Sequence, residues 1–320
     1  MRPAGRGRVC YVTLGRMDRP PQHQYDTAGR TPAWRSILGH IVVRHTRPLS
    51  LRTGRLRISH NLRAKLAFAL FAGLGAGPVS TSAAEPPACK PRPALVRLAT
   101  PLGHVGAKLT RHQPVTIVAI GSSSTWGTGA STRQASYPSR AQTELKTLFP
   151  ETPISVLNQG VGGQEIPDML KRFDDAVIVP KPDLVIWQLG TNSVIRDHMS
   201  ASPGELIREG LQRIRAIGAD IILIDPQFAP RVLAKPEAPR VVQLIAATAK
   251  AENVGLYPRF EVMKRWKEVD KLPFQVFTSP EGLHMNDWGY ACLAKDLSVA
   301  IAEAATRPVL STKTAAPTRP

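Results

Sequence analysis

The sequence predicts an α/β fold: a three-layer, doubly wound sheet of about five parallel strands with helices on both faces. Two observations carry this prediction. Short apolar runs rich in β-branched residues recur between Val115 and Ala305, and most are followed by a segment whose apolar residues have helical spacing. Continuous apolar strands are typical of parallel sheets, which are buried on both faces. Because the alternation is confined to residues 115–305, we expect one folded domain in this chain of 320 residues.

The elements follow in order along this domain. Strands are expected at Val115–Ile120, Ile154–Leu157, Asp183–Leu189, Ile221–Ile224 and Gly255–Tyr257. Helices are expected at Tyr137–Phe149, Glu165–Ala176, Pro203–Ile217, Val241–Glu252 and Asn286–Ala304. Such alternation forms parallel crossover units, here in flavodoxin-like order. Residues 85–114 are interpreted as an arm on the surface of the domain, and residues 306–320 as a disordered tail.

The charge is unevenly distributed along the chain. The formal net charge is +18, but the first 84 residues hold 14 Lys and Arg against 2 Asp and Glu. The remaining residues hold 28 against 22, so the expected domain is only mildly basic. A basic face of the kind that binds nucleic acid is therefore not indicated, and no nucleic-acid partner is expected.

The amino-terminal region has the pattern of an exported protein. Residues 1–55 are Arg-rich and are interpreted as a disordered leader or the result of a misassigned start. Residues 56–84 carry basic residues, then the apolar run 66–77, then small residues with Ser82 and Ala84 at the −3 and −1 positions of a signal-peptide cleavage site. Twelve apolar residues are too few to span a bilayer, which takes about 20. A periplasmic or secreted protein without a stable membrane anchor is expected.

The cysteines are consistent with export. Cys10 would be removed with the leader, which leaves Cys89 and Cys292. A pair of cysteines in an oxidising compartment is a candidate disulfide. The alternative is that Cys292 is a small core residue and Cys89 a separate thiol.

Polar and small residues follow the expected strands, at the edge where open α/β sheets carry their sites. They lie at residues 121–125, 158–163 and 190–192, and a late segment at residues 281–284 adds a carboxylate and an imidazole. A serine, a histidine with an acidic partner, and amide donors are the parts of an acyl-transfer site. Gly160–Gly163 could also suggest a dinucleotide loop, but the G-x-G-x-x-G spacing is missing. No metal-ligand spacing and no cofactor motif is found.

Together these blocks resemble those of the GDSL-type, or SGNH, hydrolase superfamily, over roughly Val115 to Leu297. Residues 121–125, Gly-Ser-Ser-Ser-Thr, stand where that superfamily has Gly-Asp-Ser-x-Thr. Residues 158–163, Asn-Gln-Gly-Val-Gly-Gly, match its Asn-x-x-x-x-Gly block, and residues 190–192, Gly-Thr-Asn, match its Gly-x-Asn block. Residues 281–284, Glu-Gly-Leu-His, stand in place of Asp-x-x-His.

The resemblance implies a role for each matching residue. Ser123 would be the nucleophile, His284 the base and Glu281 the acid that orients it. The backbone N–H groups of Ser123 and Gly163 and the side chain of Asn192 would form the oxyanion hole. The chain departs from the superfamily at two positions, where Ser122 and Glu281 each replace an aspartate.

Two functions of different class follow. The first is a secreted serine esterase that removes an acyl group, such as acetyl, from a carbohydrate or a small ester; transfer of the acyl group to a sugar would use the same residues. The second is an inactive, carbohydrate-binding member of the same fold. The substrate itself is not predicted, because loops that vary within a fold set it.

Overall fold

A computed structural model describes residues 87–198 and 200–308 of the chain. The expected leader, the signal peptide and the tail beyond residue 308 lie outside these residues, as does Cys10. Within the described residues, no helix is long and apolar enough to cross a membrane.

The centre of the fold is a parallel sheet of five strands in the order β2-β1-β3-β4-β5. The strands are β1 (Val115–Gly121), β2 (Ile154–Gly160), β3 (Leu184–Gln188), β4 (Asp220–Ile224) and β5 (Gly255–Tyr257). All four pairings are parallel, so the predicted architecture and flavodoxin-like order are confirmed. The chain order reverses direction across the sheet at β1, between β2 and β3, which is where such folds bind ligands.

The apolar runs become strands because both of their faces are covered. Every residue of β3 is buried, and Trp187 is fully buried in the core. The edge strand β2 alternates instead, with Ser155 and Leu157 exposed.

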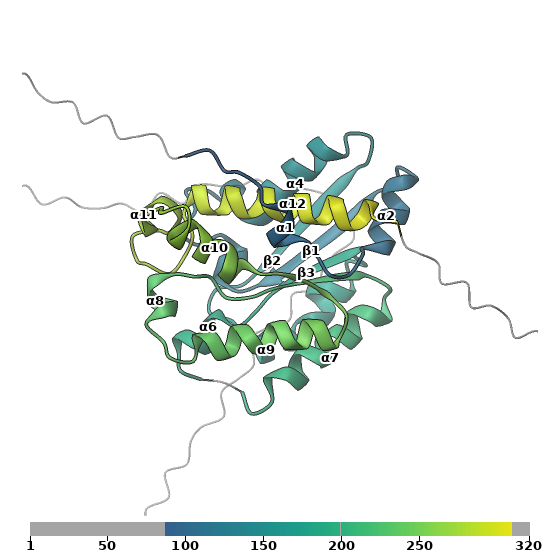
Figure 1. The fold of residues 1–320 in the computed structure, drawn as a ribbon. Helices are drawn as coiled ribbons and strands as arrows, with labels where there is room; N and C mark the ends of the chain where they lie inside the picture. The colour runs from purple at the N-terminus through teal and green to yellow at the C-terminus, as the bar shows by residue number, and fades with distance from the viewer. Residues whose placement is uncertain (1–86, 199, 309–320) are drawn as a thin grey trace, which may run out of the picture. The chain divides into compact units, whose positions relative to one another are not determined.

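Helices form a layer on each face of the sheet (Figure 1). One layer contains α2 (Gly103–Thr110), α4 (Tyr137–Leu148) and the long α12 (Asp287–Thr306). The opposite layer contains α5 (Ile166–Lys171), α7 (Pro203–Ala216) and α9 (Ala238–Ala251). The five predicted helices are all present, although α5 is shorter than expected because residues 174–178 form a π-helical turn after it.

Residues 95–114 are not a surface arm, contrary to the sequence prediction. They form the second half of α1 (Pro93–Val96) and all of α2, and Val96, Leu98, Leu102 and Val105 are buried in the core. Leu102, Val105 and Leu109 have the spacing of a buried helix face, but the stretch is short and is bounded by Pro101 and Pro114, so this signal was overlooked.

The helix α10 (Arg259–Glu268) was missed as well. Charged residues dominate its sequence, and one of them, Arg259, is fully buried. Burial of a charged residue is rare, so composition pointed away from a packed helix here.

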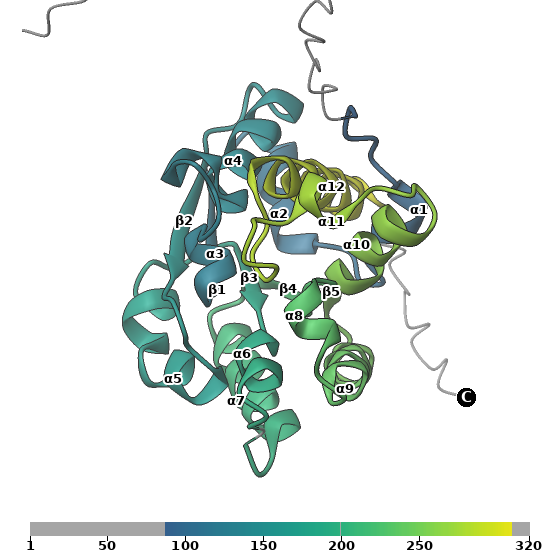
Figure 2. The same cartoon turned by 90° about the vertical axis from the view of Figure 1, so that its left-hand side faces the viewer.

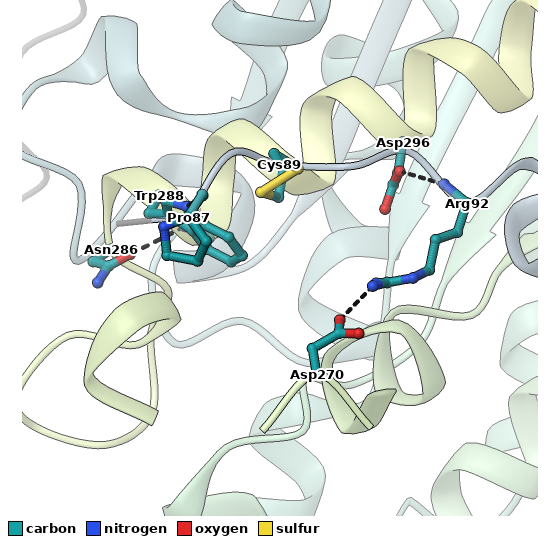
Figure 3. The surroundings of a disulfide bond; sticks show 9 residues. Pro87, Cys89, Arg92, Asp270, Asn286, Trp288 and Asp296 are labelled. Atoms are coloured by element: carbon teal, nitrogen blue, oxygen red, sulfur yellow. Dashed lines mark hydrogen bonds and ion pairs between the residues drawn. A yellow bond between two sulfur atoms is a disulfide. The ribbon is translucent and has the colours of Figure 1, made fainter. Parts of the chain in front are cut away.

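The predicted disulfide between Cys89 and Cys292 is present, with the two Cα atoms 5.4 Å apart. It ties the segment before α1 to the side of α12 (Figure 3). Arg92 adds two further contacts, an ion pair with Asp270 and a backbone N–H donated to Asp296 at 3.2 Å. The amino-terminal arm, here residues 87–92, is therefore held by covalent and polar contacts.

Candidate active site

The segments that carry the candidate residues meet at the carboxyl end of the sheet, which faces the viewer in Figure 2. The short helices α3 (Ser123–Trp126) and α6 (Thr191–Ile195) follow β1 and β3 at this end. The segment before α12 reaches the same place from the helical layer that contains α2, α4 and α12. Residues more than 150 positions apart in the chain thus become neighbours.

Ser123, His284 and Glu281 lie in one line of hydrogen bonds. The Nε2 atom of His284 is 2.8 Å from Oγ of Ser123, and its Nδ1 atom is 2.5 Å from Oε1 of Glu281. The imidazole is mostly buried, with 14% of the side chain exposed. The longer side chain of glutamate folds back far enough to reach the ring nitrogen that faces away from the serine.

The histidine loop, residues 279–286, is organised by its own atoms. The carboxylate of Glu281 accepts the backbone N–H groups of Leu283 at 2.7 Å and of His284 at 2.9 Å. The N–H of Ser279 in turn donates to the carbonyl of His284 at 2.9 Å, which closes the loop. Burial alone would raise the pKa of Glu281, but these hydrogen bonds, with those from Ser279 and His284 side chains, outweigh it and lower the pKa. The group is therefore a carboxylate at neutral pH.

The serine loop, residues 121–126, is held from a neighbouring strand. Gln188, at the end of β3, accepts hydrogen bonds from both the backbone N–H and the hydroxyl of Ser122, each at 2.9 Å. This contact requires glycine at position 121, because a Cβ there would lie 2.8 Å from Oε1 of Gln188 and 2.2 Å from Oγ1 of Thr125. Ser122 thus has a structural partner of its own, although it replaces the aspartate of the resembled motif.

A second contact fixes the loop from the other side. The side-chain amide of Asn158, on β2, donates to the carbonyl of Thr125 at 2.8 Å, and its oxygen accepts the N–H of Gly160 at 2.9 Å. The serine is therefore presented between two strands, at the start of a helical turn.

The predicted oxyanion donors are placed around this turn. Within the described residues, the N–H groups of Ser123 and Gly163 donate to no protein acceptor. Asn192, on α6, lies beside Gly163, because its Nδ2 atom donates to the carbonyl of Gln164 at 2.9 Å. The loop that carries Gly163 begins with a hydrogen bond from Val161 to the carbonyl of Gly121 at 3.0 Å, two residues before Ser123.

A model of the non-GDSL lipase-like family matches residues 88–307. The chain belongs to this family. Within the matched residues, Ser122 stands where the GDSL motif has aspartate.

Individual relatives match the chain less completely. An acetylxylan esterase from Geobacillus stearothermophilus is 37% identical over 54 residues, which span 17% of this chain and 25% of that protein. A two-domain esterase active on acetylated mannans, co-crystallised with mannopentaose, has a TM-score of 0.56 at 18% identity and covers 66% of this chain and 56% of its own. A catalytic variant of an acetylxylan esterase from Geobacillus stearothermophilus has a TM-score of 0.52 at 19% identity. The match covers 61% of this chain and 97% of that one. At this low identity, the similarity to these solved structures concerns the fold alone.

In this member of the non-GDSL lipase-like family, a set of polar contacts that the sequence analysis missed joins the start of α5 to α6 and the residue after it. Glu165, the N-cap residue of α5, accepts a hydrogen bond from Ser193 at 3.1 Å and pairs with Arg196 at 2.8 Å. Both partners lie just after Asn192, so these contacts of Glu165 hold α6 against the loop that carries Gly163. Arg172 supports the same loop through Gln164 at 2.6 Å and the carbonyl of Gln159 at 2.8 Å.

A buried polar chain connects the serine loop with the histidine loop. From Gln188 it passes to the hydroxyl of Thr191 at 3.5 Å, and on to Gln227 at 2.9 Å. Gln227 then donates to the carbonyl of Leu283, beside His284, at 3.1 Å. In the sequence, the one mark of this chain is Gln188, a polar residue at the end of an otherwise apolar run.

A buried arginine lies against this polar chain. Arg259 approaches the hydroxyl of Thr191 at 3.4 Å and donates to the carbonyl of Asp225 at 2.9 Å. The Asp225 carboxyl accepts the N–H of Phe260 at 2.9 Å, and burial raises its pKa to about 7. Asp225 is thus a buried structural group that ends β4, and is not solvated.

The side chains of the site fit acyl transfer by a serine. Within residues 87–198 and 200–308, no group of three or more His, Cys, Asp or Glu side chains is arranged to hold a metal ion.

Proposed function

We propose that this protein is a serine esterase of the SGNH type that removes an acyl group, such as acetyl, from a carbohydrate. The observation that carries the proposal is the line of hydrogen bonds from Ser123 through His284 to Glu281, at 2.8 Å and 2.5 Å. A serine hydroxyl becomes a useful nucleophile when a neutral imidazole can take its proton, and the imidazole needs a partner on its other nitrogen.

The reaction has two steps in this proposal. Oγ of Ser123 attacks the ester carbonyl while Nε2 of His284 takes the hydroxyl proton, and the carboxylate of Glu281 stabilises the imidazolium that forms. The imidazolium then gives the proton to the leaving sugar oxygen, which leaves an acyl group on Ser123. A water molecule, activated by the same imidazole, attacks this acyl-enzyme and releases the carboxylic acid.

The negative oxygen of each tetrahedral intermediate needs donors placed in advance. The N–H groups of Ser123 and Gly163 have no other protein acceptor within the described residues, which supports this role. Asn192 is the third donor: Nδ2 carries two hydrogens, and one of them is used by the carbonyl of Gln164.

The carbohydrate part of the proposal rests on the relatives. One is named an acetylxylan esterase and another is described as active on acetylated mannans. The first alignment spans a quarter of that relative, so the substrate class is inferred for this chain and must be measured.

The test is covalent labelling followed by a substrate panel. A fluorophosphonate probe reacts with an activated serine, so it should label the purified protein and leave the Ser123→Ala variant unlabelled. Acetate release from acetylated xylan and mannan should exceed that from acetylated peptidoglycan, and p-nitrophenyl esters of increasing chain length should define the acyl preference. Absence of both labelling and acetate release would favour the alternative, an inactive carbohydrate-binding protein.

Export forms a second part of the proposal. The Cys89–Cys292 disulfide supports it, since such bonds persist in oxidising compartments. If the signal peptide is cleaved after Ala84, the exported protein should begin at Glu85, which amino-terminal sequencing of the periplasmic or secreted fraction measures. An uncleaved chain in the cytoplasm would contradict it.

A further inference from the structure

A groove of about 780 Å³ lies next to the candidate catalytic residues. One part of its wall comes from residues 129–131, after α3, and another from α11 (Phe274–Phe277) with the segment before it. The first turn of α12 contributes Asp287 and Trp288, and the amino-terminal arm contributes Pro87. Figure 3 shows Pro87 and Trp288 packed together, with Asn286 beside them.

The groove adjoins His284 directly. Gly129 lines it, and a Cβ placed on Gly129 would lie 2.9 Å from the Cβ of His284. With a φ of +91° and this close approach, position 129 accepts no other residue without a shift in the backbone. Asn286, which lines the groove as well, follows His284 by two positions.

This location matters because of the direction of proton transfer. The imidazole that takes the serine proton later delivers it to the leaving oxygen, so the alcohol part of the ester must lie on the His284 side. The acyl part lies instead toward the oxyanion donors. A groove that flanks His284 is therefore on the side of the leaving sugar.

The lining has two chemical characters. Trp288, Leu272 and Pro87 give it an apolar wall, while Ser131, Gln275 and Asp287 add hydroxyl, amide and carboxylate groups. Sugar rings have apolar faces and hydroxyl-bearing edges, so such a lining can contact both. Burial tends to raise the pKa of Asp287, but hydrogen bonds from the hydroxyl and N–H of Ser131, at 2.5 and 2.8 Å, lower it overall. The carboxylate is charged at neutral pH and favours a neutral glycan over an acidic one.

We propose that this groove binds the sugar chain of an acetylated oligosaccharide, on the alcohol side of the ester, and that the disulfide-held arm forms one of its walls. The inference rests on the proposed function. The indole Nε1 of Trp288 donates to the carbonyl of Pro87 at 2.7 Å. Cys89, two residues after Pro87, is bonded to Cys292 on α12. The arm therefore holds the face of Trp288 in one orientation.

The experiment compares a substitution in the groove with a matched one outside it. Gln275 is exposed and lines the groove, so Gln275→Trp should fill it, while Gln134→Trp places the same side chain on an exposed position outside the lining. For acetylated xylo-oligosaccharides, Gln275→Trp should lower kcat/KM roughly tenfold or more, since blocking a binding contact commonly costs this much. Hydrolysis of p-nitrophenyl acetate, whose alcohol is small, should change by less than about twofold. Gln134→Trp should leave both unchanged.

A binding measurement separates failure of the inference from failure of the proposed function. In the Ser123→Ala background, calorimetry with an acetylated xylo-oligosaccharide should show binding that Gln275→Trp weakens roughly tenfold. If the wild type hydrolyses no ester but this binding difference holds, the esterase proposal fails and the groove assignment stands. Equal loss on both esters, or unchanged binding and turnover of the oligosaccharide, would overturn the groove assignment.

The arm gives a second test. Replacement of both cysteines by alanine should raise KM for the oligosaccharide and leave kcat and the hydrolysis of p-nitrophenyl acetate near their wild-type values, because the arm does not touch the serine. Unchanged KM for the oligosaccharide in a folded variant would remove the arm from the binding site.

Discussion

The serine loop and the histidine loop meet at the proposed catalytic centre, yet they are held in place in different ways. The serine loop depends on distant side chains, since Gln188 accepts two hydrogen bonds from Ser122 and Asn158 donates to Thr125. These partners lie 66 and 33 positions away in the chain.

The histidine loop is largely self-contained. The carboxylate that orients the imidazole also accepts two backbone N–H groups of the same loop, so Glu281 has a structural and a chemical role at once. At residues 278 and 285, an antiparallel bridge closes the base of the loop. The histidine loop therefore draws most of its hydrogen bonds from residues close by in the chain, whereas the serine loop needs the assembled sheet. Changes on the two sides should therefore differ in their effects.

The largest effect is expected for the nucleophile. Ser123→Ala should lower kcat by about three to six orders of magnitude and leave the fold intact, because no other group can form the acyl-enzyme. Ser124→Ala is the matched control: its hydroxyl is buried and has no hydrogen-bond partner within the described residues, so its removal should cost little. Steady-state kinetics and thermal unfolding measure both effects. A dead Ser124→Ala beside an active Ser123→Ala would assign the nucleophile to the wrong serine.

The next largest effect concerns the acid. Glu281→Gln should lower kcat about a hundredfold or more, and less than His284→Ala does, because a poorly oriented imidazole can still act as a base. If Glu281→Ala retained nearly full activity, His284 would work without this partner.

The same distinction explains how much could be predicted from the sequence. The five strands and the four site blocks were predicted because each is continuous in the chain, and their apolar runs and spacings carry the information. The roles of Gln188 and Gln227 could not be predicted, because each depends on partners brought together by the sheet. Arg259 was missed for a related reason: only the folded chain supplies the carbonyl and hydroxyl oxygens that make its burial possible.

A smaller effect should separate the two loops through their buried glutamines. Gln188→Leu leaves the N–H and the hydroxyl of Ser122 unpaired, which should lower stability by about 2–4 kcal/mol. It should also lower kcat about tenfold or more, because the serine loop loses its acceptor. Gln227→Leu removes a hydrogen bond to Leu283 in a loop that holds itself, so its kcat should change far less. Chemical denaturation and kcat for p-nitrophenyl acetate test both. Equal losses of kcat would show that the two loops are equally dependent on the buried chain.

The buried Asp225, which contacts Arg259 beside the polar chain, should also have its own pH signature. Burial raises the folded-state pKa of Asp225 to about 7, above the ordinary aspartate value of 3.8, so between these values the folded protein binds more protons than the unfolded chain. Stability should therefore fall as pH rises from about 4 to 7, by up to about 4 kcal/mol for this one group. Asp225→Asn keeps an acceptor for the N–H of Phe260 and should flatten this part of the profile. Urea denaturation under non-reducing conditions at several pH values measures it, and an unchanged slope in the variant would contradict the assignment.

The histidine loop should show the opposite sign and the smallest effect. The pKa of Glu281 is lowered in the folded protein, so the unfolded chain takes up its proton first as pH falls. The stabilising contribution is fully present above the unfolded value of about 4.5 and is lost as pH falls through the lower folded-state pKa. Because 42% of the side chain is exposed, solvent screening should keep the contribution below about 1 kcal/mol. Glu281→Gln should therefore reduce the loss of stability on acidification and leave the slope between about pH 5 and 7 unchanged, since that slope comes from carboxyl groups whose pKa is raised by burial, Asp225 and Asp296. A steeper acid loss in Glu281→Gln than in the wild type would mean that the carboxylate is not stabilised by the N–H groups of its own loop.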